Sequence, residues 1–236
     1  MTSAIPKPRA VLLPGTGSDE IFVRSVFAGP ARAAGIEAVF PRPSAGSGLA
    51  VGFLTLLDSL AAEAPLVVGG ISFGAHLAAE WAVRNPRRCA GLLLALPAWH
   101  GAPAGAPASL AAKVSADLVE REGLEKALSL SVAGVAPWLA DELTRTWRRH
   151  GTGLAAGLRV AAGHPAPTVD ELRTLDRPVG IAACTDDPVH PVAVAREWAA
   201  ALPRAVLRET TLTALGADRE SLGRAAVEAW RAAYAS

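Results

Sequence analysis

LVVGGISFG, residues 66–74, is the stretch of sequence that decides the fold of this chain. Its first half is an uninterrupted apolar run, which is typical of a strand covered on both faces in a parallel sheet. Its second half is a G-x-S-x-G centred on Ser72, and a helical pattern follows at 75–84. This order predicts a sharp turn from strand to helix that presents the Ser72 hydroxyl at the end of the strand. The competing interpretation is a glycine-rich turn in which Ser72 only caps the helix.

The rest of the chain repeats this alternation of apolar runs and helical patterns. Apolar runs that predict strands lie at 10–13, 37–40, 91–96, 179–183 and 205–210. Apolar residues spaced three or four positions apart predict helices at 20–34, 49–64, 75–84, 192–202 and 220–234. Strands that alternate with helices indicate an α/β fold. We therefore expect a mostly parallel, twisted sheet of about six strands with helices on both faces.

One interval, between His100 and Leu175, breaks the alternation. It contains helical patterns but no convincing strand, and the helices are predicted at 109–120, 124–135, 138–150 and 153–162. The Gly- and Pro-rich stretch at 101–107 predicts a loop or hinge before them. A run of helices inserted between two strands indicates a small cap over one edge of the sheet. We predict a core formed by residues 1–99 and 176–236, with residues 100–175 as the helical cap.

Composition excludes several classes of protein. Hydrophobic residues are 51% of the chain, charged residues 19%, and the net charge is +1. The chain is too apolar to be disordered and has no overall field that would attract nucleic acid or an anionic membrane. Residues 1–9 lack the apolar core of a signal peptide, and no apolar run approaches a membrane span. Cys89 and Cys184 belong to no metal or redox motif, so we expect free thiols in a cytoplasmic protein.

The order of these motifs resembles the α/β-hydrolase superfamily over most of the chain. The turn at 14–17 (PGTG) follows the first strand, the Ser72 turn follows a later one, and a helical insertion and an acidic turn come after it. The resemblance implies that Ser72 is a nucleophile and that the backbone N–H groups of Thr16 and Phe73 hold an oxyanion. Pro14 stands where many relatives have His. A dinucleotide-binding fingerprint is the rival interpretation of this turn, but the third glycine that it needs is Glu20.

The acidic turn at 184–191, CTDDPVHP, resembles the family's Gly-x-x-Asp-x-x-x-Pro. This alignment selects Asp187 over Asp186 and puts Cys184 in the glycine position. The implied role of Asp187 is to orient and stabilise a protonated histidine. The alternative is a turn in which Asp187 caps the helix expected to start near Val192.

The family's catalytic base, a histidine after the last strand, is missing. The matching turn at 214–219 carries Ala217 in that place, and no histidine follows His190. A serine hydroxyl without a base is a poor nucleophile at neutral pH. His190, three residues beyond Asp187, and His100, after the strand at 91–96, are the candidate replacements, and His76 is a weaker one. Each of them can also be a pocket-lining or hydrogen-bonded histidine.

Other residues could line a substrate pocket. Trp99 and His76 lie close to Ser72 in the predicted fold, and together with Phe73 and the cap tryptophans Trp138 and Trp147 they could form an apolar pocket. Plain packing between cap and core is an equally good interpretation of the tryptophans. We expect no metal and no cofactor, because the ligand types near Asp187 lack a metal-binding spacing.

Two functional hypotheses follow from these residues. The first is a serine hydrolase, an esterase or thioesterase, in which Ser72 attacks the carbonyl of a small molecule or peptide with a modest, largely apolar acyl group. The second is a chain that keeps the fold but lacks a working triad, and that binds a small molecule or peptide or performs lyase or epimerase chemistry. The missing terminal histidine favours the second hypothesis, and the intact G-x-S-x-G favours the first.

Overall fold

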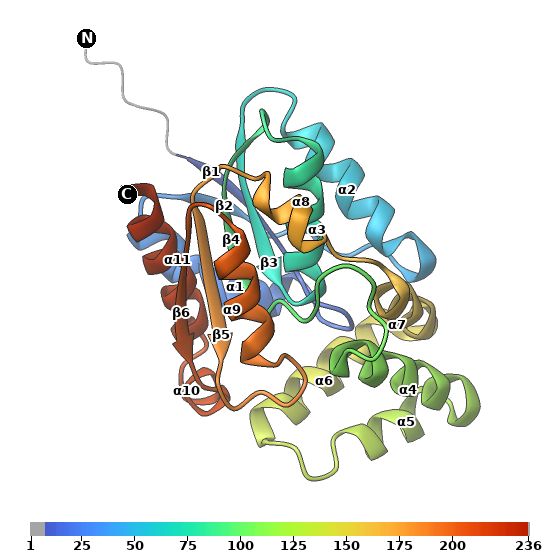
Figure 1. Ribbon diagram of the computed structural model, residues 1–236. Helices are drawn as coiled ribbons and strands as arrows, with labels where there is room; N and C mark the ends of the chain where they lie inside the picture. Colours follow the sequence, from blue (N-terminus) through green and yellow to red (C-terminus); the bar gives the residue numbers. More distant parts are fainter. Residues whose placement is uncertain (1–7, 236) are drawn as a thin grey trace.

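A parallel sheet of six strands lies at the centre of the computed structural model, which describes residues 8–235 (Figure 1). The residues before Pro8, on which the argument against a signal peptide rests, lie outside the described residues. The strand order is β2-β1-β3-β4-β5-β6, and every pair is parallel. The strands are β1 (Arg9–Leu13), β2 (Glu37–Val39), β3 (Leu66–Ile71), β4 (Cys89–Ala95), β5 (Val179–Cys184) and β6 (Ala205–Thr210). The predicted α/β fold is confirmed, including the number of strands.

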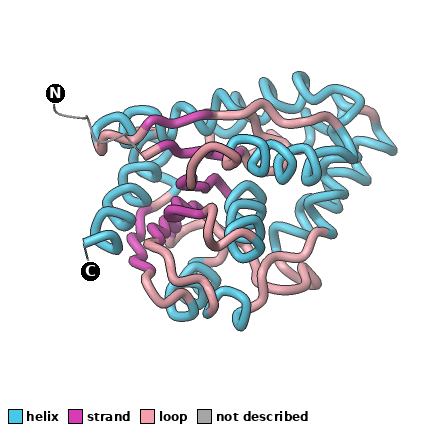
Figure 2. Tube along the Cα trace, turned by 90° about the horizontal axis from the view of Figure 1, so that it is seen from above, coloured by secondary structure: helices cyan, strands magenta, loops and turns pink. Residues whose placement is uncertain are grey.

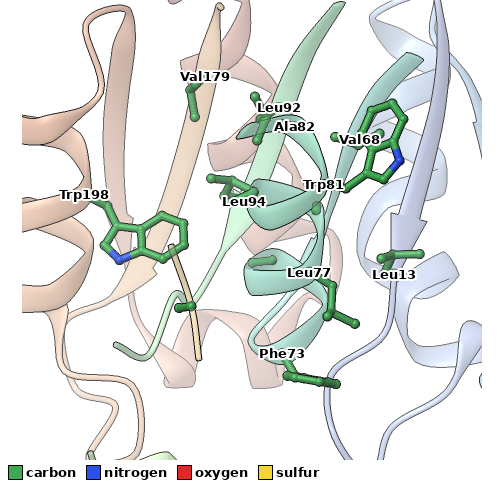
Figure 3. Packing of buried hydrophobic residues seen from close by; sticks show 14 of the residues in the cluster. Leu13, Val68, Phe73, Leu77, Trp81, Ala82, Leu92, Leu94, Val179 and Trp198 are labelled. Atoms are coloured by element: carbon green, nitrogen blue, oxygen red, sulfur yellow. The ribbon is translucent and has the colours of Figure 1, made fainter. Parts of the chain in front are cut away.

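The central strands are buried on both faces, which explains their unalternating apolar sequences. In β1, Val11 and Leu13 belong to the core on one face of the sheet, whereas Ala10 and Leu12 belong to the core on the other. Successive side chains of a strand point to opposite faces, so a strand with two dry faces must be apolar throughout. Figure 3 shows one of these cores, in which Trp81 and Trp198 flank the leucines of β4.

Two layers of helices cover the sheet, and the view in Figure 2 shows the strands flanked by them. One layer contains α2 (Leu49–Leu60), α3 (Phe73–Arg84), α8 (Val169–Arg173) and α9 (Val192–Ala201). The other contains α1 (Glu20–Ala33), α10 (Leu212–Ala217) and α11 (Glu220–Ala235). The sequence analysis missed α8, a short helix whose Thr168 and Glu171 form a reciprocal capping box.

The remaining helices gather beyond one end of the sheet (Figure 1). They are α4 (Pro107–Glu122), α5 (Leu124–Ser131), α6 (Pro137–His150) and α7 (Leu154–Gly163), and they share a small apolar core of their own. Short 3-10 helices at Gly46–Gly48 and Gly151–Gly153 precede α2 and α7. All four helices predicted for the cap are present, whereas α8, which also lies between β4 and β5, packs beside α3 and α9 on the sheet. The exact division between core and cap stays a prediction.

The segment after β6 differs from the sequence-based interpretation. Residues 214–219 were expected to form a turn, but Leu212–Ala217 is the helix α10. Thr211 caps this helix, because its hydroxyl accepts the backbone N–H of Ala214, and Leu215 anchors it in the core. Among the described residues, no helix is both long and apolar enough to cross a bilayer.

The free cysteines are confirmed, and both are buried. Burial raises the pKa of each thiol to about 12, so neither is a thiolate at neutral pH. Cys89 belongs to β4 and Cys184 ends β5. These side chains act as small apolar residues of the sheet.

Close packing of α11 on β5 gives a testable prediction. A Cβ atom on Gly180 would lie 2.1 Å from the carbonyl oxygen of Ala226 and 2.4 Å from the backbone nitrogen of Trp230. Both are backbone atoms of α11, so the helix must move. We expect Gly180→Ala to lower the free energy of unfolding by about 2–3 kcal/mol, measured by urea titration. The matched control is Gly163→Ala in α7, where a Cβ meets nothing within 4 Å, and stability should stay the same or rise. Equal midpoints for the two variants would contradict this account of the packing.

Candidate active site

Ser72 occupies a strained turn between β3 and α3. Its backbone has φ 54° and ψ −116°, a conformation that costs a non-glycine residue on the order of 1–3 kcal/mol. A Cβ on Gly70 or on Gly74 would lie 2.3 Å from the carbonyl oxygen of Leu13 at the end of β1. The two glycines of the motif therefore let the turn pass tightly against the neighbouring strand. The Ser72 hydroxyl makes no capping hydrogen bond to α3, so capping does not account for this serine.

The imidazole of His190, in the loop after β5, lies beside the Ser72 hydroxyl. Its Nε2 lies 2.8 Å from Ser72 Oγ, and its Nδ1 lies 2.8 Å from Asp187 Oδ2. Ser72, His190 and Asp187 thus form a continuous hydrogen-bonded chain. Ser72 comes from the end of β3 and the other two residues from the loop after β5. This is the geometry of a nucleophile, a base and an acid that orients the base.

The Asp187 carboxylate also organises the loop that carries His190. Its Oδ1 accepts the backbone N–H groups of Val189 at 2.8 Å and of His190 at 3.1 Å. Burial by itself raises the pKa of Asp187, but the hydrogen bond and charge of His190 and the two backbone N–H groups outweigh it and hold the pKa below its usual value. Asp187 is therefore ionised at neutral pH. An ionised Asp187 requires His190 to donate from Nδ1, which leaves Nε2 free to accept the Ser72 hydroxyl proton.

Asp186, which the alignment did not select as the acid, makes a different contact. Its Oδ1 accepts the backbone N–H of Leu212 at 2.6 Å and so ties the loop after β5 to the start of α10. Leu212 and Leu215 of α10 line the same cavity as Ser72. The segment in which the family resemblance places the base thus contributes an apolar wall instead.

The loop after β1 passes directly beside the Ser72 turn. A Cβ on Gly15 would lie 3.4 Å from the Cβ of Ser72, and Thr16 lines the cavity at Ser72. Within residues 8–235, neither the backbone N–H of Thr16 nor that of Phe73 has a hydrogen-bond partner. Phe73 is the first residue of α3, where backbone N–H groups have no partner in the helix. Both N–H groups are thus unpaired, which is a condition of the oxyanion prediction. Among the described residues, Thr16 is part of the cavity wall and Phe73 is not.

A cavity of about 540 Å³ opens above Ser72, between the end of the sheet and the cap. This volume falls within the range of small-molecule sites. Trp99, predicted as a pocket residue, lines it, as do Trp138 and Trp147 of α6. The wall is mostly apolar; further members are Ala108, Ala111, Ala112, Val135, Leu139, Leu143, Leu158 and Ala161. The sequence analysis did not predict that α4 forms part of the cavity wall, although Ala108, Ala111 and Ala112 of α4 are spaced as on one face of a helix.

His76 does not line this cavity, in contrast to the expectation. It is 1% exposed, its Nε2 accepts the backbone N–H of Ala98 at 2.9 Å, and its ring stacks on Trp198 and meets the edge of Trp99. Burial, together with the charges of His190 and His164, lowers the pKa of His76 to about 3, so the ring is neutral. His76 therefore supports the wall from behind.

His100, the other candidate base, also lies elsewhere. Its Nε2 is 3.1 Å from a carboxylate oxygen of Glu197 on α9, and the side chain is 41% exposed. Among the described residues, the wall of the Ser72 cavity includes Trp99 but not the next residue, His100. His190 alone of these candidates bonds to the Ser72 hydroxyl.

Comparison with known proteins gives relatives by structure only. No family model and no curated protein matches the sequence. The chain is similar to the structure of Rv0554 from Mycobacterium tuberculosis, with 18% identity, 97% of this chain and 92% of that chain covered, and a TM-score of 0.74. It is also similar to the putative non-heme bromoperoxidase BpoC from Mycobacterium tuberculosis H37Rv. The identity is 17%, 98% of this chain and 94% of that chain are covered, and the TM-score is 0.71. A third similar structure is that of a thermophilic esterase from Thermogutta terrifontis. The identity is 18%, 86% of this chain and 81% of that chain are covered, and the TM-score is 0.61. The fold is therefore that of the α/β hydrolases.

The lowered pKa of Asp187 predicts how acid destabilises the protein. The unfolded chain takes up this proton near pH 4, whereas the folded chain does so only at lower pH. The stabilising contribution of Asp187 is thus complete above about pH 4 and is lost as the pH falls through the folded pKa. Urea unfolding between pH 6 and pH 3 should therefore show a smaller acid loss of stability for Asp187→Asn than for the wild type. The control is Asp170→Asn, whose side chain is 88% exposed. If the unfolding free energy of Asp187→Asn falls with pH as steeply as that of the wild type, the lowered pKa of Asp187 is contradicted.

Proposed function

We propose that this chain, which has the α/β-hydrolase fold, is a serine hydrolase of carboxylic esters or thioesters. The observation that carries the proposal is the 2.8 Å contact between Ser72 Oγ and His190 Nε2, with Asp187 behind the imidazole. A hydroxyl becomes a good nucleophile when a neighbouring base can take its proton. One of the structural relatives is itself an esterase.

In the proposed first step, Ser72 Oγ attacks the carbonyl carbon of the ester while its proton passes to His190 Nε2. The imidazolium that forms is stabilised by the ionised Asp187 at Nδ1. The negative charge on the former carbonyl oxygen is held by the backbone N–H groups of Thr16 and Phe73. As the tetrahedral intermediate collapses, the bond to the leaving oxygen or sulfur breaks and His190 returns its proton to that atom. The products are an alcohol or thiol and an acyl-Ser72 enzyme.

Water completes the cycle in the proposed second step. His190 Nε2 removes a proton from a water molecule, which attacks the acyl carbon. The second tetrahedral intermediate breaks its bond to Ser72 Oγ, and His190 donates the proton to that oxygen. The acid leaves, and the free serine is restored with all protons accounted for.

The cavity supports an acyl group that is apolar and of modest length. Its alkyl part would lie against α4 and α7, where Ala112, Leu158 and Ala161 are part of the wall. Burial of each methylene group there stabilises the bound ester by about 0.8 kcal/mol. Small molecules and peptides that carry such a group are the proposed substrates, without nucleic acid or membrane as a partner.

The rival hypothesis, a scaffold without a working triad, loses its main support. It rested on the absence of a histidine after β6. His190 occupies the same chemical position from another loop, and the strained Ser72 backbone is costly to keep without a use for the hydroxyl. This geometry favours the hydrolase over the binding, lyase or epimerase alternatives.

Labelling with a fluorophosphonate tests the nucleophile and the base together. We expect rapid modification of Ser72, located by mass spectrometry of its peptide, and none in Ser72→Ala. His190→Ala should lower the labelling rate at least about 100-fold, because the base is lost. His100→Ala is the matched control and should label as the wild type does. A folded wild type that resists the reagent would overturn the proposed function.

Substitution of Ala112 tests the place of the acyl group. We expect Ala112→Leu to lower kcat/KM for an octanoyl ester about 10-fold, because the larger side chain fills part of the cavity. Hydrolysis of the acetyl ester should change less than about twofold, since its acyl group ends before α4. Lys113→Leu, on the exposed side of the same helix, is the control. Equal losses on both esters would place the acyl group elsewhere.

A further inference from the structure

A buried carboxylate connects the cap to the loop after β1. Asp19 ends this loop, and its side chain is 2% exposed. Its Oδ1 accepts the backbone N–H groups of Ile21 and Phe22, each at 3.1 Å, and so caps the N-terminus of α1. Capping explains the presence of a short polar side chain at this position. It does not explain a full charge, because Asn caps a helix as well as Asp does.

The charge is explained by two arginines of the cap helix α6. Arg145 contacts both carboxylate oxygens of Asp19, at 2.5 and 3.0 Å, and Arg149 contacts Oδ2 at 2.9 Å. Burial by itself raises the pKa of Asp19, but the hydrogen bonds and charge of Arg145, with help from Phe22 and Arg149, outweigh it and lower the pKa. A buried carboxylate with two charged partners and two backbone donors is fully satisfied. Asp19 thus fastens α6 to the loop by strong, directional contacts.

The residues just before Asp19 contact the same helix. His150 at the end of α6 donates from Nε2 to the carbonyl oxygen of Ser18, at 2.8 Å. A Cβ on Gly17 would lie 3.2 Å from Nε1 of Trp147, and Gly17 has φ 65°, so a larger residue there would be strained and close against this ring. Residues 17, 18 and 19 are therefore each held by the last two turns of α6. The next residue toward the N-terminus is Thr16, which lines the Ser72 cavity and whose backbone N–H has no hydrogen-bond partner within residues 8–235.

The same helix forms a wall of the cavity. Trp138, Leu139, Glu142 and Leu143 of α6 line it, and Glu142 bonds to Arg145 at 2.5 Å. One rigid element therefore touches both the cavity and the loop. A shift of α6 would move the loop after β1 with it, because the ion pairs of Asp19 with Arg145 and Arg149 connect the loop to the helix.

We propose that Asp19 is a positioning residue, which uses Arg145 and Arg149 to hold the Thr16 N–H in line with the oxyanion that forms on Ser72. This role rests on the proposed hydrolase function. A donor that is fixed before the reaction needs no reorganisation when the charge appears, and a small misplacement removes much of its effect. The cap is then required for the chemistry as well as for the shape of the cavity.

Asp19→Asn separates this role from helix capping. Asn keeps the size of the side chain and the cap of α1 but removes the charge that pairs with the two arginines. We expect kcat for a short acetyl ester to fall about 10- to 100-fold, with KM within about twofold, since loss of one oxyanion donor costs 100- to 1,000-fold. The inhibition constant of an alkylboronic acid, whose adduct with Ser72 places an oxygen at the oxyanion position, should rise by a similar factor.

The matched control is Arg148→Gln. Arg148 lies on the same helix but pairs with Glu125 of α5, on the exposed side of the cap, with Nη2 at 2.7 Å from the carboxylate. It should leave kcat and the boronic acid constant within about twofold. Arg145→Gln should resemble Asp19→Asn, and the double variant should lose no more than the worse of the two single variants, because they break one shared contact.

The outcomes separate the two proposals. If Ser72 of the wild type reacts with a fluorophosphonate but Asp19→Asn and Arg145→Gln keep the wild-type kcat and boronic acid constant, the positioning role is overturned and the hydrolase stands. A lower melting temperature with unchanged kinetics would also overturn it, because it would leave Asp19 a structural role only. If the wild type itself does not react, the hydrolase and the positioning role fail together. Should Asp19→Asn not fold, Arg145→Gln decides, since the Arg145 side chain is 33% exposed.

Discussion

The close approach of the Ser72 turn to the end of β1 is the constraint on which the rest of the site depends. The carbonyl oxygen of Leu13 lies where a Cβ on Gly70 or Gly74 would be, so the turn and the strand can touch only through glycine. This contact brings the loop after β1 beside Ser72, and Thr16 of that loop lines the cavity at Ser72. It also lies where the chain changes direction across the sheet, since β1 has β2 on one side and β3 on the other. Open parallel sheets bind their ligands at such a switch point.

A second consequence of the structure is that the proposed acid, Asp187, and the proposed base, His190, share one loop. Asp187 holds its own loop closed through the backbone of Val189 and His190, and the same carboxylate orients the His190 ring. The orientation of the imidazole therefore depends on local contacts within a few residues. The segment after β6 contains no histidine. It forms α10 and contributes Leu212 and Leu215 to the cavity wall. The proposed chemistry thus needs no histidine after β6, and this segment makes the cavity wall more apolar.

The cap joins these parts into one site. Its helices α4, α6 and α7 enclose the cavity, and the last turns of α6 grip the loop that precedes α1. Most ion pairs within the cap are exposed and contribute little to stability, because water screens the charges. The ion pairs of Asp19 with Arg145 and Arg149 differ from these, because the Asp19 carboxylate is buried and both arginines bind it from α6. For the proposed chemistry, the cap contacts that matter are therefore few, and they lie where the cap meets the core.

Sequence alone determined the strands, most helices and the Ser72 turn, because apolar runs and glycine spacing are local properties that need no knowledge of distant contacts. It also named Asp187 and placed His190 among the candidate bases. It could not choose between His190 and His100, since that choice depends on which loop folds back over Ser72, and it wrongly placed His76 in the cavity and a turn at 214–219. Asp19, Arg145 and Arg149 were invisible to it for the same reason. Their partners lie more than a hundred positions apart in the chain. Such contacts form only when the sheet and the cap pack together, so tertiary structure alone decided them.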